Sequence, residues 1–400
     1  MTEAQDAASV TPQRGPKPPI PLSIITGFLG AGKTTLLNRI LKDPAMADTA
    51  VIINEFGDVG LDHLLVDQSS EGILELSSGC LCCTIRGDLI NTLEDLLRRL
   101  DNGRMERLAR VVIETTGLAD PAPILHTVML HPYLMLRYRL DSVVTLVDAV
   151  NGSATLDAHQ EAVRQAAVAD RLVLTKTDLL EGDAGEATLE ALTARLKALN
   201  PGAQLLNGQK GEADAAHLFN AGLYDPATKI PDVARWLNAQ AYESHGHHHH
   251  GHDHAHGHHH HDHGHDHNHH DVNRHDDKIR AFTLTANRPV PASALEMFLD
   301  LLRSAHGPKL LRVKGIIQIA EDPDRPVVIH GVQHVFHPPV TLAGWPDGDR
   351  RTRLVFITYD LAEGFVRRLF DAFTGAMVSD TPDAQAMMDN PLAISGFKPG

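Results

Sequence analysis

The stretch LSIITGFLGAGKT, residues Leu22–Thr34, decides the fold of the first half of this 400-residue chain. Its first five residues form an apolar, β-branched run, and Gly27–Thr34 then fits the pattern GxxxxGK[ST] directly before an amphipathic run. A strand that leads through such a turn into a helix is the context in which this pattern binds phosphate. Backbone N–H groups close around the phosphate oxygens, and the helix N-terminus adds its positive dipole end. We therefore expect a nucleotide site at Gly27, Gly30, Ala31, Gly32, Lys33, Thr34 and Thr35.

Two residues are predicted to be catalytic. Lys33 is expected to reach the β- and γ-phosphates, while Thr34 is expected to offer its hydroxyl to Mg²⁺. Farther along, VVIETTG ends a hydrophobic strand at Glu114. NTPases of this type place an acidic residue there, near Mg²⁺ or the attacking water. We therefore predict catalytic roles for Lys33 and Glu114; an ordinary strand-end carboxylate is the alternative for Glu114.

The base contact is predicted from TKTD, residues Thr175–Asp178, which follows the strand RLVLT. It resembles the guanine-recognition motif NKxD, in which the Asp accepts hydrogen bonds from guanine N1–H and the exocyclic amine. Adenine does not offer these donors in that arrangement. We expect Thr175, Lys176 and Asp178 to bind a guanine nucleotide, with one polar contact altered because Thr175 replaces the Asn. An ATP-using kinase or synthetase is the alternative, and the TKTD motif argues against it.

Short β-branched runs alternate with amphipathic stretches up to about residue 243. This alternation predicts repeated βα units and a mostly parallel sheet. The fold class is therefore α/β: a P-loop NTPase G domain over 21–243, followed by a small α+β C-terminal domain over 278–376. Expected strands of the first domain are 22–26, 50–54, 110–114, 142–148 and 171–175, and expected helices are 33–43, 88–100, 186–199 and 232–239.

All three cysteines of the chain stand in the tetrapeptide CLCC, residues Cys80–Cys83. In a reducing compartment this spacing favours metal binding or redox chemistry over a structural disulfide. Soft thiolates favour Zn²⁺ or Cu⁺ over Mg²⁺, and three protein ligands leave a coordination position open for handing the metal on. We predict Cys80, Cys82 and Cys83 as metal ligands, with Cys80 and Cys82 facing one side if the segment is extended. Glu55 and Asp58 are either extra ligands or solvated loop acids.

A histidine-rich segment provides a second kind of metal binding. Of the 26 residues from 245 to 270, 17 are His, and the rest cannot build a core, so 244–277 is expected to be a flexible linker. Many combinations of imidazoles there can bind Zn²⁺, Ni²⁺, Co²⁺ or Cu²⁺, each weakly specified. A purification tag and a merely solvated linker are the alternatives. The expected buffering ligands are His247, His248, His249, His250, His258, His259, His260 and His261.

Composition narrows the partners and the location. The formal net charge of −15 gives no basic field for nucleic acid or an anionic membrane. The first residues lack an apolar h-region, and no later apolar run approaches the length of a membrane span. We expect a cytoplasmic protein with a disordered N-terminal tail over 1–20 and a C-terminal tail over 377–400. The oligomeric state stays open.

Five segments, taken in order, resemble the CobW-like family of metal-binding P-loop GTPases: GFLGAGKTTLLNRIL, INEFGDVGLD, SSGCLCCTIRGDL, IETTGLADP and TKTDL. The resemblance covers about 21–240, and about 278–375 looks like the family's C-terminal domain. It implies a G domain related to the hydrogenase and urease nickel-insertion GTPases, with slow GTP hydrolysis coupled to metal delivery. It also implies that the CxCC cysteines bind the metal and that the P-loop binds GTP with Mg²⁺.

We therefore expect a GTP-hydrolysing metallochaperone that binds Zn²⁺ at Cys80, Cys82 and Cys83 and delivers it to a client protein. Co²⁺ and Ni²⁺ are alternative metals, because members of the family serve zinc homeostasis or cobalt insertion in cobalamin synthesis. The alternatives are a cobalt-handling GTPase of cobalamin biosynthesis and a non-catalytic metal buffer based on the histidine run.

Overall fold

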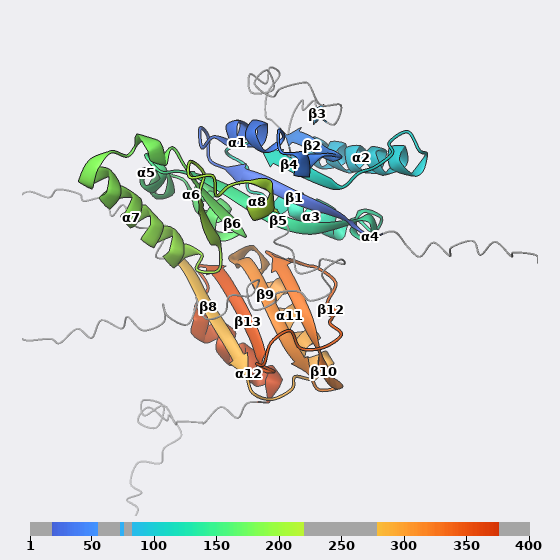
Figure 1. The fold of residues 1–400 in the computed structure, drawn as a ribbon. Coiled ribbons are helices and arrows are strands. Elements are labelled where there is room, and N and C mark those ends of the chain that lie inside the picture. The colour runs from blue at the N-terminus through green and yellow to red at the C-terminus, as the bar shows by residue number, and fades with distance from the viewer. Residues whose placement is uncertain (1–17, 55–72, 76–81, 220–277, 376–400) are drawn as a thin grey trace, which may run out of the picture.

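The computed structural model describes residues 18–54, 73–75, 82–219 and 278–375 (Figure 1). The amino-terminal domain contains a seven-stranded sheet of order β3-β2-β4-β1-β5-β6-β7, in which all neighbours are parallel. This sheet confirms the predicted α/β class, and all five expected strands are present. The strands are β1 Ile20–Gly27, β2 Thr49–Asn54, β3 Ile73–Glu75, β4 Arg110–Thr115, β5 Tyr138–Asp148, β6 Arg171–Thr175 and β7 Gln204–Asn207.

Helices cover both faces of this sheet, because its strands are apolar on both sides. In β1, Leu22 and Ile24 join one core cluster with α2 and α3, whereas Ile25 joins another with α1 and α8. A third cluster holds Leu172 of β6 against α5, α6 and α7. The helices are α1 Lys33–Ile40, α2 Cys82–Asp101, α3 Ala122–Leu130, α4 Leu134–Arg137, α5 Gly152–Ala158, α6 Gln160–Ala167, α7 Gly182–Leu199 and α8 Ala215–Leu218, with 3-10 turns η1 Pro44–Met46 and η3 Thr177–Leu179.

The parallel order brings the loops after β1, β4, β5 and β6 to one edge of the sheet. In such sheets, ligands bind outside the carboxyl ends of the strands. The P-loop leaves β1 in the middle of the sheet, with β4 on one side and β5 on the other. The residues that follow Glu114 and those that follow Thr175 therefore flank the predicted phosphate site.

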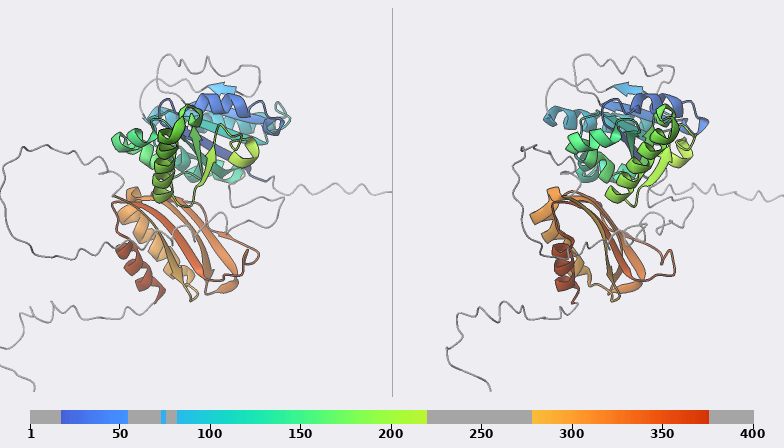
Figure 2. Two further views of the ribbon diagram at one scale, coloured as in Figure 1. Left: turned by 60° about the vertical axis from the view of Figure 1, so that its left-hand side comes forward. Right: turned by 90° about the vertical axis from the view of Figure 1, so that its left-hand side faces the viewer.

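The C-terminal domain contains a six-stranded antiparallel sheet of order β11-β10-β9-β13-β8, with β12 paired to β10. Helices α11 and α12 cover one face (Figure 2) and share an apolar cluster with it. The predicted α+β class of this domain is confirmed. Its elements are β8 Ile279–Ala286, α11 Ala292–His306, η5 Gly307–Lys309, β9 Leu310–Ile319, β10 Asp322–Val332, β11 Val335–Phe336, β12 Val340–Thr341, β13 Thr352–Tyr359 and α12 Glu363–Thr374.

The two domains are joined by a buried charge cluster. Asp170, just before β6, accepts hydrogen bonds from the Arg312 guanidinium at 2.5 Å and from Lys314 Nζ at 2.9 Å. Arg312 also donates to the Val168 carbonyl oxygen, and the backbone N–H of Val143 donates to the second Asp170 oxygen at 3.0 Å.

Burial and charge act in opposite directions on this cluster. Burial raises the pKa of Asp170, but Arg312 and Lys314 outweigh it and hold that pKa well below its ordinary value. Burial and the neighbouring Arg312 lower the pKa of Lys314 to about 8, although Asp170 acts to raise it. The contact is therefore a buried ion cluster between residues that are distant in the sequence.

The apolar run PVVIHGVQHVF, residues 326–336, predicts a strand, and if the whole run were one strand His330 and His334 would share a face. The chain instead turns after Val332, with Gln333 at φ 53°, and returns as β11. His330 therefore stacks on His337, with ring centroids 5.6 Å apart, whereas His334 meets the ring of His126 edge-on. Burial lowers the pKa of His337 to about 4, so this imidazole is neutral at pH 7.

Several predicted features lie outside the described residues: Cys80, Glu55, Asp58, the histidine segment, the helix at 232–239 and most of both tails. The backbone of Cys82 and Cys83 is described, and these residues open α2, so the chain is helical there rather than extended. Within the described ranges, no cluster of three or more His, Cys, Asp or Glu is arranged to hold a metal ion. None of the helices described is both long and apolar enough to cross a membrane.

Candidate functional site

Glycine lets the P-loop leave β1 in a conformation that other residues rarely adopt. Gly27 has φ 142°, and a Cβ built on it would lie 2.5 Å from the Leu146 carbonyl oxygen of β5. Gly32, with φ 90°, caps α1 at its N-terminus. The loop is thus pressed against the neighbouring strand and delivers the chain directly into the helix that supplies N–H groups for an anion.

The Lys33 ammonium is already held at the P-loop. Its Nζ donates to the carbonyl oxygens of Gly27 at 3.0 Å and of Phe28 at 3.3 Å. These bonds bend the side chain back over the loop that is predicted to cradle phosphate. A positive charge fixed in this way can stabilise phosphate oxygens with little reorganisation.

The structure brings Thr34 and Glu114 together from separate parts of the chain. Thr34 Oγ1 donates to Glu114 Oε1 at 3.4 Å, and the Glu114 side chain is buried at the end of β4. The next residue, Thr115, donates its hydroxyl to Thr26 Oγ1 of β1 at 2.7 Å. Hydroxyl and carboxylate oxygens are the hard ligands that Mg²⁺ prefers, so this pair fits the ion that a P-loop NTPase requires.

Thr175 contacts the P-loop from the position where the guanine motif has Asn. Its Oγ1 donates to the Ala31 carbonyl oxygen at 2.9 Å and has a second, longer contact to the Val147 carbonyl oxygen at 3.3 Å. The Thr175 hydroxyl therefore links the end of β6 to the P-loop. Asp178 lies in η3 and is exposed to solvent, where its carboxylate can meet a base edge.

Asp148, which lies outside the motifs recognised in the sequence, fixes the position of Lys176. Lys176 Nζ donates to Asp148 Oδ2 at 2.7 Å, and Asn151 contributes further hydrogen bonds to the same carboxylate. Burial raises the pKa of Asp148, but the bonds from Lys176 and Asn151 outweigh it, so the pKa is lower than usual. Asp148 is the last residue of β5, which pairs with β1. An acidic residue at the end of a predicted strand was therefore the sequence signal that could have marked Asp148 as a site residue.

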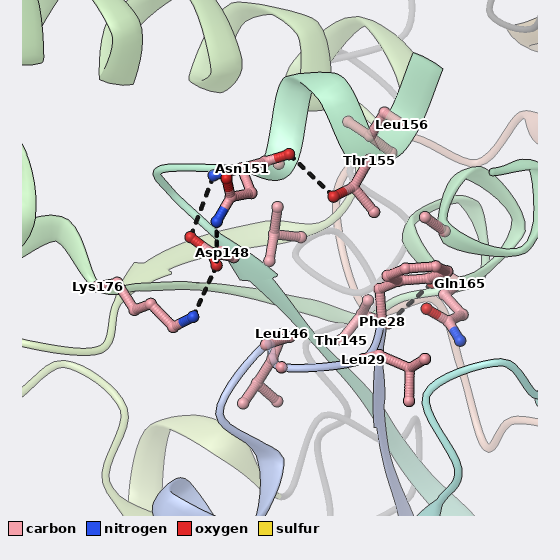
Figure 3. A pocket seen from close by; sticks show the side chains of 15 residues that line it. Phe28, Leu29, Thr145, Leu146, Asp148, Asn151, Thr155, Leu156, Gln165 and Lys176 are labelled. Atoms are coloured by element: carbon pink, nitrogen blue, oxygen red, sulfur yellow. Dashed lines mark hydrogen bonds and ion pairs between the residues drawn. The ribbon is translucent and has the colours of Figure 1, made fainter. Parts of the chain in front are cut away.

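Two cavities adjoin the P-loop. One, of about 300 Å³, lies between Phe28–Ala31, the end of β5, and helices α5 and α6. In Figure 3, Asp148, Asn151 and Lys176 form its hydrogen-bonded side, whereas Phe28, Leu29 and Gln165 lie at the other. The other cavity, of about 150 Å³, brings together four of the predicted nucleotide residues; it is lined by Gly32, Thr35, Leu36, Arg39, Val173, Thr175, Lys176, Gly208 and Gln209.

The loop after β7 completes the smaller cavity and was missed in the sequence. Asn207 Oδ1 accepts from Thr177 Oγ1 at 2.9 Å and from the backbone N–H of Gln209 at 3.0 Å. Arg39 of α1 donates to the Gly208 carbonyl oxygen at 2.6 Å. The sequence QLLNG contained the signal, a short apolar run followed by turn residues, but four residues are too few to separate from a loop.

Gly117, in the loop after β4, allows that loop to touch the P-loop. A Cβ on Gly117 would lie 2.5 Å from the Leu29 backbone nitrogen, closer than real Cβ atoms approach. We expect Gly117→Ala to displace the P-loop and to lower kcat for the predicted GTP hydrolysis by about 10²-fold, since a misplacement of about 1 Å can cost that much. Phosphate release measures it, and Gly348→Ala, where a Cβ meets nothing within 4 Å, is the control. A drop of less than twofold would contradict the close packing.

Comparison with known proteins gives two family matches. Residues 21–207 match the CobW/HypB/UreG nucleotide-binding domain, and residues 279–374 match the cobalamin synthesis protein CobW C-terminal domain. The boundaries 21–243 and 278–376 stay predictions.

The individual relatives cover either most of this chain or less than half of it. The zinc chaperone YjiA of Escherichia coli is 34% identical over 357 residues, which cover 88% of this chain and 98% of the relative. A crystal structure of Zn(II)-bound YjiA GTPase matches with a TM-score of 0.61 and 30% identity, covering 89% of this chain and 99% of that one. The zinc-regulated GTPase metalloprotein activator 1 of Schizosaccharomyces pombe is 41% identical over 42% of this chain and 41% of its own length.

Proposed function

Because the chain belongs to the CobW/HypB/UreG family of P-loop GTPases, we propose that it is a GTP-hydrolysing metallochaperone. It binds Zn²⁺ at Cys80, Cys82 and Cys83 and transfers the ion to a client protein. The observation that supports this most is the similarity along 88% of the chain to a protein named a zinc chaperone. The confinement of all three cysteines to CLCC gives the metal a chemically suited place.

The proposed hydrolysis uses the P-loop edge. Lys33 places its ammonium against the phosphate oxygens, and the α1 N-terminus adds its dipole to the same charge. Thr34 and Glu114 would hold Mg²⁺, which would neutralise charge on the phosphates. Asp178 accepts hydrogen bonds from the guanine edge, while Thr175 keeps the P-loop attached to the strand that carries this contact.

The proposed coupling between nucleotide and metal follows from α2. This helix begins at Cys82, and its Leu89 and Leu93 lie in the same core cluster as Ile24 of β1 and Ile113 of β4. The strands that end at the phosphate site therefore pack directly on the helix that carries two of the proposed ligands. A metal that binds more tightly in the GTP state must, by linkage, strengthen GTP binding by the same factor.

The test is a competitive Zn²⁺ titration against a chromophoric chelator on a variant lacking residues 245–270. Removal of the histidine run leaves the cysteine site as the main competitor for the metal. We expect the state with Mg²⁺ and a non-hydrolysable GTP analogue to bind Zn²⁺ at least about tenfold more tightly than the state with Mg²⁺ and GDP, a coupling of about 1.4 kcal/mol.

The control is the same variant with Cys80, Cys82 and Cys83 replaced by Ser, which should lose the difference between nucleotide states. Equal affinities in the two states would contradict a nucleotide-gated carrier and leave a static metal site. The same titration with Co²⁺ tests the cobalt-handling alternative, because a cobalt carrier should show the nucleotide effect with Co²⁺ and not with Zn²⁺.

A further inference from the structure

The loop that follows Glu114, residues 116–121, is held in place by α6. The Gln165 side chain is fully buried, and its Nε2 donates to the carbonyl oxygens of Gly117 at 3.2 Å and Ala119 at 2.9 Å. One of these carbonyls belongs to the glycine that touches the P-loop at Leu29. The position of this loop therefore affects both the strand end at Glu114 and the phosphate loop.

Asp120, in the same loop, links it to the first turn of α3. Its Oδ1 accepts from the backbone N–H of Ala122 at 2.9 Å, which satisfies a donor at the start of that helix. Its Oδ2 lies 3.5 Å from an Arg164 nitrogen of α6. Asp120 is thus the point at which the loop, α3 and α6 meet.

The C-terminal domain reaches this point with the turn between β10 and β11. Gln333 Nε2 donates to Asp120 Oδ2 at 3.2 Å. The residue before it, Val332, has its carbonyl oxygen 3.0 Å from His126 Nε2 of α3, and its side chain lies in the main core cluster of the amino-terminal domain.

The backbone of this turn is itself well held. Gln333 adopts a left-handed conformation, and its backbone N–H donates to the Leu310 carbonyl oxygen at 2.6 Å. Gly307 lies so close that a Cβ there would be 2.6 Å from the Cβ of His334. The amide of Gln333 is therefore presented to Asp120 by a fixed piece of the C-terminal domain.

We propose that Gln333 is a positioning residue for GTP hydrolysis in the other domain. Through Asp120 it holds the loop 116–121 against the P-loop. The positions of Glu114 and Lys33 relative to each other are thereby fixed. The C-terminal domain thereby sets the hydrolysis rate without touching the nucleotide. The Asp170 cluster and the apolar contacts of Val332 already hold the two domains together. Neither of these contacts needs an amide at position 333.

The first test is Gln333→Leu in the full chain, which removes the amide and keeps the size of the side chain. We expect kcat for GTP to fall about tenfold, in the range that a misplaced active-site group produces, with KM and the unfolding midpoint nearly unchanged. Gln318→Leu is the matched control. Gln318 lies near the end of β9, whereas the backbone of Gln333 is bonded to Leu310 at the start of that strand. The backbone of Gln318 bonds to Val290 and Thr352 within the C-terminal domain.

The second test reverses the hydrogen bond. Gln333→Glu alone should slow hydrolysis, because its carboxylate would face that of Asp120 without a donor between them, whereas Asp120→Asn alone should change kcat little, since the Gln333 amide can turn to accept from Asn Nδ2. Together they should restore most of kcat, because Asn Nδ2 can donate to the Glu carboxylate while Asn Oδ1 still accepts from Ala122. The proposal is overturned if Gln333→Leu keeps kcat within 1.5-fold of the parent, or if the double variant is no faster than the slower single variant.

Discussion

Replacement of Lys33 by alanine is expected to lower kcat for GTP hydrolysis by about two to three orders of magnitude, the cost of removing one preorganised charge-stabilising donor. In the structure, Lys33 Nζ is held by the Gly27 and Phe28 carbonyl oxygens, over the loop that is predicted to bind phosphate. Alanine leaves the helix start unchanged but removes the only side-chain cation that the P-loop residues Gly27–Thr34 carry. The loss should therefore appear in catalysis rather than in folding.

Single-turnover phosphate release measures this loss, and Lys42→Ala is the control, because Lys42 follows the end of α1 and lines neither of the cavities described. Lys33→Ala also distinguishes the proposed metal carrier from the alternative, a non-catalytic metal buffer. A carrier should lose GTP-dependent transfer of Zn²⁺ to an acceptor while its histidine run still takes up metal. Full transfer by Lys33→Ala, with or without GTP, would refute the carrier and favour the buffer.

The meeting of the P-loop, Glu114 and Thr175 at one edge of the sheet is largely predictable from the sequence, because each of these parts is a local pattern. The P-loop, the strand end at Glu114 and the motif at Thr175 each lie on a few consecutive residues, and the parallel sheet brings them together without further information. The specific partner of Thr175 was not predictable. Whether its hydroxyl meets the base or the Ala31 carbonyl oxygen depends on the approach of β6 to the P-loop in space.

Contacts between the domains could not be predicted from one sequence. Asp170 and Arg312 are 142 positions apart, and neither stands in a recognisable motif. The turn at Gln333 was missed because the apolar run on either side continues the strand period, while the residue that breaks it is an ordinary Gln in a left-handed conformation. The strand β3, at three residues, was too short to show a period at all.

The largest stability loss is expected from Asp170→Asn. This change leaves the Arg312 guanidinium and the Lys314 ammonium without their carboxylate, and the side chains of both cations are at most 10% exposed. Removal of one member of a buried ion pair typically costs about 3–5 kcal/mol, because the remaining charge is desolvated and uncompensated. Asn can still accept from the Val143 N–H, so the loss should come from charge rather than from shape.

Chemical denaturation should show this loss as a lower free energy of unfolding. Arg350→Gln, which breaks the exposed ion pair with Asp324, is the control and should change it by less than about 1 kcal/mol. Addition of Arg312→Met and Lys314→Met to Asp170→Asn removes the buried cations as well, so this triple variant should regain much of the stability. Recovery of stability would show that the cluster stabilises the domain junction by charge compensation. A triple variant less stable than Asp170→Asn would instead mean that Arg312 and Lys314 hold the domains together through contacts that do not depend on charge compensation, such as the bond from Arg312 to Val168.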